Sequence, residues 1–595
     1  MTYKAPVRDY QFLIRDVFHT DQYGNLKGFD SADSETVMMI LDEAAKFAEE
    51  VVAPINITGD KEGCILDPAT HEVTAPKGYK EAYHALAEGG WTALSGDPAY
   101  GGQGLPHFVN TAFSEMLSGA SSAFGMYPGL TEGAISAITA GGTEEQKNLY
   151  LPKLISGEWS GTMNLTEPHC GTDLGLLRTK AVPAADGSYR ISGQKIWISA
   201  GEHDFTSNIC HLVLARIEGA PEGVKGISLF LVPKFLPDAD GNPVTRNSLQ
   251  CAGLEHKMGI HGNSTCVMVY EGATGFLLGQ PNEGLKIMFY MMNAARYGVG
   301  LQGLAIGHAA YVAAEQFAKD RLQGRALTGP KSPDKPADSI LVHPDVRRML
   351  LESRALIEGG RAFLLWLALQ ADFQHVAEDE KDREKASDYM GLLTPVIKAY
   401  LTDKGFRVTS DAMQVHGGSG FTEHFPASQY MRDVRITMIY EGTNGVQALD
   451  LVGRKLPSKG GRALQTFLAE VDAYVAAEDS GPVPAYVKAL KDTKAKLMDG
   501  TMWLMQNGMG HPDNAAAGSL DYLHLFGLVC MAYMWAMMAK AAQEKINDGS
   551  DDPLYATKLK IGRVFLERIL PDADAHLAKM KAGAEALMAL EDELF

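Results

Sequence analysis

The chain has 595 residues, of which 46% are hydrophobic and 21% charged, a composition typical of folded globular proteins. A chain of this length is too long for one hydrophobic core and is expected to form roughly three or four domains. Its formal net charge of −19 argues against proteins that hold nucleic acid or anionic membranes on a basic surface. The six cysteines are scattered, without CxxC pairs or His/Cys metal spacing, so we expect reduced thiols, no metal site and a cytoplasmic protein.

The first part of the chain is predicted to be helical. An N-terminal extension, residues 1–33, carries charges throughout its opening segment and lacks the apolar region of a secretory signal. Residues 34–160 are predicted to form an N-terminal helical domain, because apolar residues recur at helical spacing. We expect Pro54 to end the first helix, 34–53, since proline commonly terminates a helical pattern.

Residues 161–282 are predicted to form a β domain. Short segments rich in β-branched and aromatic residues occur there, separated by Gly, Asp and Pro. These segments are 189–199, 211–217, 226–232 and 266–272. Their partial alternation predicts an antiparallel arrangement of about 120 residues.

The helical period returns in the second half of the chain. Residues 283–456 are predicted to form a helical bundle, and Pro and Gly mark a linker near 455–462. A further helical domain is predicted over 464–595. Its most apolar run, 525–539, is shorter than the roughly 18 residues that a membrane span needs. We therefore expect a buried helix and no membrane insertion.

One carboxylate stands out in the segment 435–456. Glu441 ends an apolar stretch and is followed at once by Gly442. A glutamate at a solvated helix end has no such requirement, but a glutamate that reaches into a water-poor cleft does. Burial against apolar walls would raise its pKa and make it a stronger base than a surface carboxylate.

Five motifs in order resemble the acyl-CoA dehydrogenase family. They are "MNLTEPHCGTD" (163–173), "GQKIWISAG" (193–201), "EHKMGIHGNST" (255–265), "NAARYGVG" with "AKDRLQGRAL" (293–300 and 318–327), and the segment 411–447. The resemblance implies a mainly α-helical chain with a central β-barrel domain, here followed by an extra C-terminal helical domain.

The resemblance also implies FAD as the cofactor. The family positions that contact it match Leu165, Thr166, Trp197, Ser199, Arg321, Gln323, Gln414, Gly417, Gly418 and Thr443. Arg321 and Gln323 would bind the flavin pyrophosphate of a neighbouring subunit, which implies a homo-oligomer, with a dimer expected. Taken from the residues alone, Trp197 also fits a tryptophan in the core of a strand, and Arg321 a solvated helix end.

Three positions depart from the family pattern. His169 and Cys170 make the first motif bulkier than the small residues usual there. Gly324 occupies the place of a phenylalanine, and Gly445 replaces a longer polar residue that contacts FAD in many relatives.

The catalytic base of the family matches Glu441. Some members carry the base on the long helix instead, one residue before the arginine that matches Arg296, but Ala295 stands there and cannot abstract a proton. Thr172, Arg296, Tyr440 and Gly442 match substrate contacts. The resemblance implies oxidation of an acyl-CoA thioester to a trans-2-enoyl-CoA, with an electron-transfer flavoprotein as electron acceptor.

The length and the opening segment look most like the long bacterial members that oxidise 3-methylmercaptopropionyl-CoA in dimethylsulfoniopropionate breakdown. Short-, medium- and long-chain acyl-CoA remain alternative substrates, and an acyl-CoA oxidase would share every motif. A nitroalkane oxidase relative would carry Asp at the position of Glu441, and a DNA-binding relative would need a basic C-terminal surface.

Overall fold

The structure is a computed structural model that describes residues 3–508 and 510–595. The chain forms two compact units. The mixed unit comprises Lys46–Leu105 and Ala120–Gly298, and the helical unit comprises the chain up to Ala45 together with Pro106–Gly119 and Val299–Phe595.

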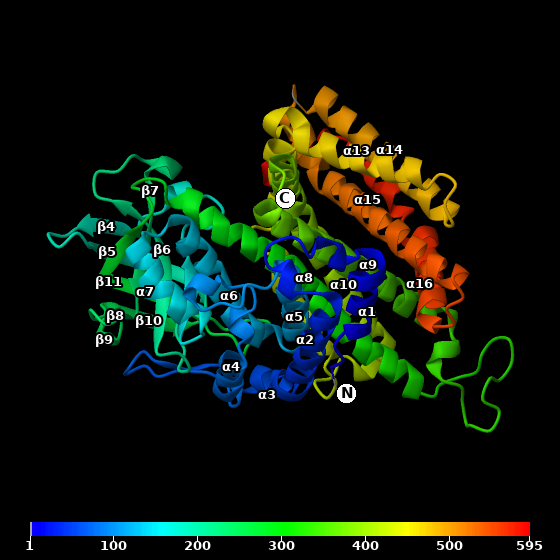
Figure 1. The fold of residues 1–595 in the computed structure, drawn as a ribbon, viewed down its shortest axis with the longest axis horizontal. Helices are drawn as coiled ribbons and strands as arrows, with labels where there is room; N and C mark the ends of the chain where they lie inside the picture. The colour runs from blue at the N-terminus through cyan, green and yellow to red at the C-terminus, as the bar shows by residue number, and fades with distance from the viewer. Residues whose placement is uncertain (1–2, 509) are drawn as a thin grey trace. The chain divides into compact units, whose positions relative to one another are not determined.

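The strands of the mixed unit close into a barrel (Figure 1). The seven-stranded sheet contains β3 (Trp159–Asn164), β4 (Lys180–Pro183), β5 (Tyr189–Ser199), β6 (Asn208–Ile217), β7 (Ile227–Pro233), β10 (Leu249–Leu254) and β11 (Thr265–Leu278). Pairing runs from β11 through β5, β4, β6 and β7 and back to β11, with β10 and β3 attached to the ring. The predicted strands are all present.

The predicted antiparallel arrangement holds for most strand pairs of this sheet, but two pairs depart from it. Both β3 and β4 pair with β6 in parallel. Parallel pairing is typical of strands buried on both faces, and β6 is buried at every residue from Asn208 to Ala215.

The prediction that Pro54 ends the first helix is wrong. The helix α2 (Ser34–Lys46) continues through a π-helical segment, Phe47–Val52, into α3 (Ala53–Glu62). Pro54 lies in the first turn of α3, directly after the π-helical segment. The mixed unit also contains α4 (Tyr79–Glu88), α6 (Ser122–Gly141), α7 (Glu144–Ile155) and the N-terminal part of α8 (Gly284–Asp320).

The helical unit is built on long helices. These are the C-terminal part of α8 (Gly284–Asp320), α9 (Pro344–Val376), α10 (Glu380–His416) and α15 (Pro512–Asn547), with the shorter α11 (Ala427–Arg435), α12 (Asn444–Asp450), α13 (Arg462–Ala477), α14 (Pro484–Asn507), α16 (Pro553–Val564) and α17 (Asp572–Lys581). A mainly α-helical chain with a central β-barrel and additional C-terminal helices is therefore confirmed.

The helix α15 forms the centre of the C-terminal helices (Figure 1). Its length and mean hydropathy of 1.5 would allow a membrane span, but 89% of its most apolar window is buried in the fold. Gly527 brings it against α10, since a Cβ there would lie 2.3 Å from the ring of Tyr400. The prediction of a buried helix at 525–539 is confirmed.

The N-terminal extension belongs to the helical unit. From α1 (Val7–Phe12), Asp9 bonds both Arg361 of α9 and Lys558 of α16. Arg361 also pairs with Glu115 of α5 (His107–Ala120) at 2.6 Å, and Lys558 pairs with Glu358 at 2.8 Å. These buried ion pairs join the extension, the central helices and the C-terminal helices.

Candidate functional site

Glu441 lies in a turn of left-handed backbone. The turn follows a 3-10 segment, Ile436–Met438, and precedes α12. Glu441 has φ of +59° and Gly442 has φ of +87°. A non-glycine residue in this region costs roughly 1–3 kcal/mol and persists only where its surroundings impose it. The Glu441 side chain is half-buried.

Buried side chains hold the carbonyl groups of this turn. Gln447 donates from Nε2 to the Glu441 carbonyl at 3.2 Å, and Lys398 donates from Nζ to the Gly442 carbonyl at 2.8 Å. Both side chains are completely buried. Thr443 caps α12, because its hydroxyl accepts from the Val446 N–H at 3.2 Å. A Cβ on Gly442 would lie 2.5 Å from Nε2 of Gln447, so the turn requires glycine there.

Tyr440 anchors the turn on its N-terminal side. Burial, and then the negative charge of Glu441, raise the pKa of Tyr440 above its ordinary value. The neutral hydroxyl donates to Gln302 of α8. Glu441 therefore stands between two anchored neighbours on a backbone that is fixed from both sides.

Trp197 lies in a bulge of β5. Ile198 pairs with Cys266 of β11, but Lys195 pairs with Met268, so β5 has one residue more than its partner over this step. Trp197 has φ of +59° and its side chain is 61% exposed. A bulge can redirect a side chain away from the sheet. The alternative of a core tryptophan is therefore wrong, while Ser199 at the end of β5 is half-buried.

A buried ion pair fixes the first motif to β5. The Ile196 N–H donates to the Thr166 carbonyl at 2.9 Å, and Lys195 donates from Nζ to the Leu165 carbonyl at 3.0 Å and to Glu167 at 2.9 Å. Burial lowers the pKa of Lys195 to about 8, although Glu167 favours the charged form. The segment with Leu165 and Thr166 is thus tied to the strand that carries Trp197.

His169 and Cys170 lie beside Glu167 in the same loop. One possible ligand atom from each of the three lies within 4.8 Å of the others. The carboxylate of Glu167 already accepts from Lys195, from the Thr179 hydroxyl at 2.6 Å and from two backbone N–H groups. The Glu167 carboxylate is therefore the buried partner of the Lys195 ammonium group. Thr172, two residues after Cys170, is exposed.

The remaining predicted cofactor residues of the helical unit are exposed at helix ends. Gln414 lies in the last turn of α10, and Gly417 and Gly418 follow it. Neither glycine has an atom within 4 Å of an added Cβ, and Gly417 has φ of +58°. Open glycine backbone of this kind suits the close approach of a phosphate group. Arg321 and Gln323 are exposed just after α8.

Arg296 lies on the N-terminal part of α8 and is 8% exposed. The structure thus places Leu165, Thr166, Thr172, Trp197, Ser199 and Arg296 in the mixed unit. It places Arg321, Gln323, Gln414, Gly417, Gly418, Tyr440, Glu441, Gly442 and Thr443 in the helical unit.

The sequence reading missed the residues that hold these groups in place. They are Glu167, Lys195, Lys398, Asn444 and Gln447, all buried. Lys398 interrupts an apolar stretch, a signal of the same kind as that at Glu441, whereas Lys195 follows Gly193 and Gln194 and gives no such signal. A buried charge needs a partner, but its partner is distant in sequence and no local pattern identifies it.

The chain matches four family descriptions in succession. These are "Acyl-CoA dehydrogenase, N-terminal domain" over 34–158, "middle domain" over 162–273, "C-terminal domain" over 282–456, and "Acetyl-CoA dehydrogenase C-terminal like" over 467–591.

Individual proteins are similar over nearly the whole chain. A 3-methylmercaptopropionyl-CoA dehydrogenase of Ruegeria pomeroyi is 41% identical, with 99% of both chains covered. A broad-specificity linear acyl-CoA dehydrogenase of Mycobacterium tuberculosis is 35% identical over 96% of both chains. The crystal structure of a Bacillus anthracis acyl-CoA dehydrogenase complexed with FAD matches with a TM-score of 0.74 and 21% identity, covering 99% of this chain and 93% of that one. At that identity the structure establishes the shared fold.

Proposed function

Since the chain belongs to the acyl-CoA dehydrogenase family and is an FAD-dependent oxidoreductase acting on CH–CH bonds, we propose that its substrate is 3-methylmercaptopropionyl-CoA. The product would be 3-methylmercaptoacryloyl-CoA, formed in dimethylsulfoniopropionate breakdown. The observation that carries this choice is the 41% identity to the Ruegeria pomeroyi enzyme along 99% of both chains.

In this proposal Glu441 removes the proton from the carbon next to the thioester carbonyl. The step needs a carboxylate held against that carbon, and the anchored left-handed turn supplies a fixed position for one. FAD, when bound, accepts the hydrogen of the neighbouring carbon as hydride. The backbone N–H of Glu441 would donate to the thioester oxygen as negative charge develops there, a contribution worth roughly a hundredfold or more in rate.

The residues proposed to bind FAD are chosen because their chemistry and exposure suit the parts of the cofactor that they would contact. Trp197 would cover the flavin ring, and Leu165, Thr166 and Ser199 would meet its polar edge. Gln414, Gly417, Gly418, Thr443, Arg321 and Gln323 would meet the remainder of FAD. The exposed Trp197 and the open glycines support this assignment. Thr172, Arg296, Tyr440 and Gly442 would contact the acyl-CoA.

We further propose a cytoplasmic homodimer that passes electrons to an electron-transfer flavoprotein. Arg321 would contact the FAD of the partner subunit, because its guanidinium is exposed and suits phosphate oxygens. The proposed domain limits are 1–33, 34–160, 161–282, 283–456 and 464–595. Light scattering on the yellow holoenzyme tests the dimer, and a monomer with full FAD occupancy would exclude it.

A second candidate substrate class is linear fatty acyl-CoA. The 35% identity to the broad-specificity Mycobacterium tuberculosis enzyme favours it, as does 32% identity to a butyryl-CoA dehydrogenase of Syntrophomonas wolfei. The two proposals differ in how strongly the thioether would be preferred over a methylene group of the same chain length.

Anaerobic flavin reduction with a panel of acyl-CoA esters tests the substrate. Pentanoyl-CoA matches 3-methylmercaptopropionyl-CoA in chain length and replaces sulfur with a methylene group. We expect faster reduction by the thioether at equal concentration. Equal or faster reduction by straight chains would favour the linear class, and peroxide release in air would indicate an oxidase.

A further inference from the structure

A chain of polar contacts leads from the Glu441 turn into the helical unit. Asn444 is the first residue of α12 and is buried. Its Oδ1 accepts from Nζ of Lys398 at 2.8 Å, the same ammonium group that bonds the Gly442 carbonyl. Its Nδ2 donates to Oδ1 of Asp403 at 2.7 Å. The same Nδ2 group also donates to the Thr402 hydroxyl at 2.9 Å and to the Ala399 carbonyl at 3.3 Å, so Asp403 is the charged one of three acceptors that orient the Asn444 amide and leave its Oδ1 facing Lys398.

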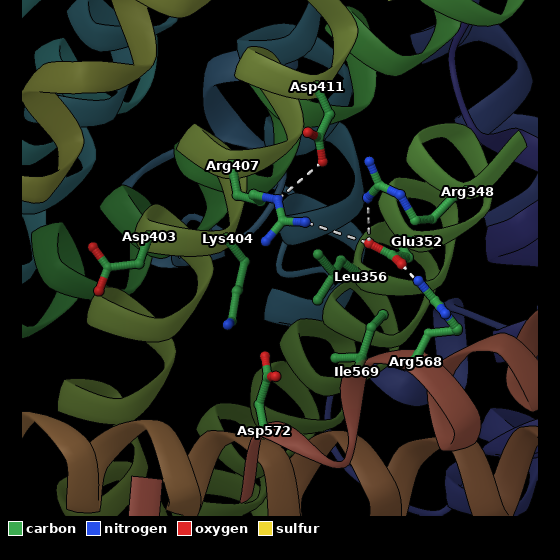
Figure 2. Close-up of a pocket in the computed structure, with 10 residues that line it drawn as sticks. All are labelled: Arg348, Glu352, Leu356, Asp403, Lys404, Arg407, Asp411, Arg568, Ile569 and Asp572. Atoms are coloured by element: carbon green, nitrogen blue, oxygen red, sulfur yellow. Dashed lines mark hydrogen bonds and ion pairs between the residues drawn. The ribbon is translucent and has the colours of Figure 1, made fainter. Parts of the chain in front are cut away.

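Asp403 lies at the edge of a cavity of about 380 Å³ in the helical unit (Figure 2). Its neighbours there include the cations Lys404 and Arg407 of the same helix. Figure 2 shows the Asp403 carboxylate directed away from both. Arg407 pairs with Asp411 at 3.0 Å and with Glu352 at 3.4 Å instead.

His524 of α15 holds the other oxygen of Asp403. Its Nε2 lies 2.8 Å from Oδ2, and its Nδ1 is buried without a hydrogen-bond partner among the described residues. Burial lowers the pKa of His524 below its ordinary value and outweighs the bond to Asp403. The neutral ring then has one N–H, and the contact to Asp403 places it on Nε2. His576 of α17 stacks on the ring at 5.1 Å.

We propose that His524 and Asp403 are positioning residues, through which the C-terminal helices set the orientation of the Glu441 turn. The contacts run from His524 to Asp403 and from Asp403 to Asn444. They continue from Asn444 to Lys398 and end at the Gly442 carbonyl. Every group in it is at least half-buried. A left-handed turn at a non-glycine residue needs such outside support.

The inference rests on the proposed role of Glu441 and assigns the C-terminal helices a part in the reaction. Removing the His524 N–H frees the Asp403 carboxylate to rotate toward Lys404. Asn444 then loses the charged one of its three acceptors, and the amide that helps to direct Lys398 at the turn is held less firmly. A shift of about 1 Å in a reacting group can cost about a hundredfold in rate without weakening substrate binding.

The test compares holoenzyme variants in anaerobic stopped-flow flavin reduction. His524→Phe keeps an aromatic ring and removes the N–H, and His524→Gln restores an amide donor. Asp403→Ala breaks the same contact from the α10 side. Tyr533→Phe is the matched control, since it removes a 3.3 Å bond between α15 and Glu470 and leaves Asp403 untouched.

We expect His524→Phe and Asp403→Ala to reduce the flavin about tenfold or more slowly, at unchanged FAD content and unchanged affinity for the enoyl-CoA product. His524→Gln should recover most of the rate, and Tyr533→Phe should match the wild type. A purely structural role would lower the thermal midpoints of His524→Phe and Asp403→Ala and would slow flavin reduction in neither.

Wild-type reduction rates in both His524→Phe and Asp403→Ala would overturn the proposal. If His524→Phe does not hold FAD, the rate of Asp403→Ala decides. A Glu441→Gln control in the same assay separates the proposed role of Glu441 from the positioning role of His524 and Asp403. A wild-type rate in this control would overturn the proposed base and the inference that rests on it. An inactive Glu441→Gln beside fully active His524 and Asp403 variants would overturn the positioning role alone.

Discussion

At the residue scale, backbone strain coincides with the proposed chemistry. Trp197 and Glu441 are both non-glycine residues with positive φ, at +59° in each case. Such residues cost free energy and persist where function or surrounding contacts require them. Each has a buried lysine nearby that bonds backbone carbonyls, Lys195 next to Trp197 and Lys398 beneath Glu441. Lys398 therefore holds the strained turn itself, whereas Lys195 holds the loop that contains Leu165 against the strand that carries Trp197.

Gly442→Ala tests the requirement for glycine in the turn that carries the proposed base. The new methyl would meet Nε2 of Gln447 at 2.5 Å on a backbone with φ of +87°. We expect a loss of about 1–3 kcal/mol of local stability and at least a tenfold slower flavin reduction. Gly391→Ala in α10 is the control, because an added Cβ there has open space. Equal rates for the two variants would contradict the structure of the turn.

The pKa of Lys195 predicts that the loop proposed to bind flavin loses a contact at alkaline pH. Because burial lowers its pKa to about 8, the ammonium group that pairs with Glu167 is lost as the pH rises through that value. The unfolded chain binds more protons between pH 8 and the ordinary lysine pKa, so this group alone makes stability rise over that window. The contact of Lys195 with Glu167 nevertheless weakens as the ammonium group loses its charge.

We therefore expect the dissociation constant of FAD to increase above about pH 8 while the thermal midpoint does not fall in parallel. Equilibrium titration of apoprotein with FAD from pH 6 to 10 measures it. Lys195→Met should bind FAD more weakly at every pH and lack the alkaline step. A wild-type FAD affinity that stays level through this range would count against the role of the ion pair.

The sequence singled out the proposed reacting groups more readily than the residues that support them. Glu441 and Trp197 stood out because each lies in a motif that resembles the family pattern. Their left-handed backbone could not be identified, because it depends on Gln447, Lys398 and the register of β11, which act across tertiary contacts. The expected departures at His169 and Cys170 form part of a loop that Glu167 organises.

At the element scale, strands and long helices follow their local periodicity, while their pairing does not. The apolar and aromatic content of β5, β6, β7 and β11 predicted their positions. The parallel pairing of β6 with β3 and β4 was missed, since the alternation of residues within one strand does not identify the strands that pair with it. Likewise, Pro54 looked like a terminator because the preceding π-helical segment has no simple sequence signal.

Gly527→Ala tests the contact between α15 and α10. The added methyl would lie 2.3 Å from the Tyr400 ring, where both helices are buried. Overpacking of this kind costs roughly 1–3 kcal/mol. We expect a lower thermal midpoint in differential scanning fluorimetry, and Tyr400→Leu in the same chain should recover part of the loss. Gly453→Ala, with open space around the added methyl, should leave the midpoint unchanged.

At the scale of the whole molecule, the additional C-terminal helices are integral to the helical unit. Lys558 and Arg361 meet at Asp9, which joins the N-terminal extension to both. Burial works to raise the pKa of Asp9, but the two cations outweigh it and hold the pKa below its usual range. The stabilisation is present above the pKa of an unfolded aspartate and is lost as the pH falls below it.

Asp9→Ala is therefore expected to cost about 1–3 kcal/mol at neutral pH, because it removes the carboxylate that two buried cations share, while Arg361 keeps Glu115 and Lys558 keeps Glu358. Arg8→Ala is the control, since the Arg8 side chain is 62% exposed and its pair with Asp552 contributes roughly 0–1 kcal/mol. Thermal midpoints at pH 7 measure both effects. Similar midpoints for the two variants would show that the buried pairs do not hold the extension in place.

The central claim is that one half-buried carboxylate, Glu441, takes the α-proton of an acyl-CoA. Stopped-flow reduction of the Glu441→Gln holoenzyme under anaerobic conditions tests it most directly. The variant is predicted to remain yellow and to bind the enoyl-CoA product, while its flavin is reduced at least about a hundredfold more slowly than in the wild type. Reduction of the Glu441→Gln flavin at the wild-type rate would contradict the account.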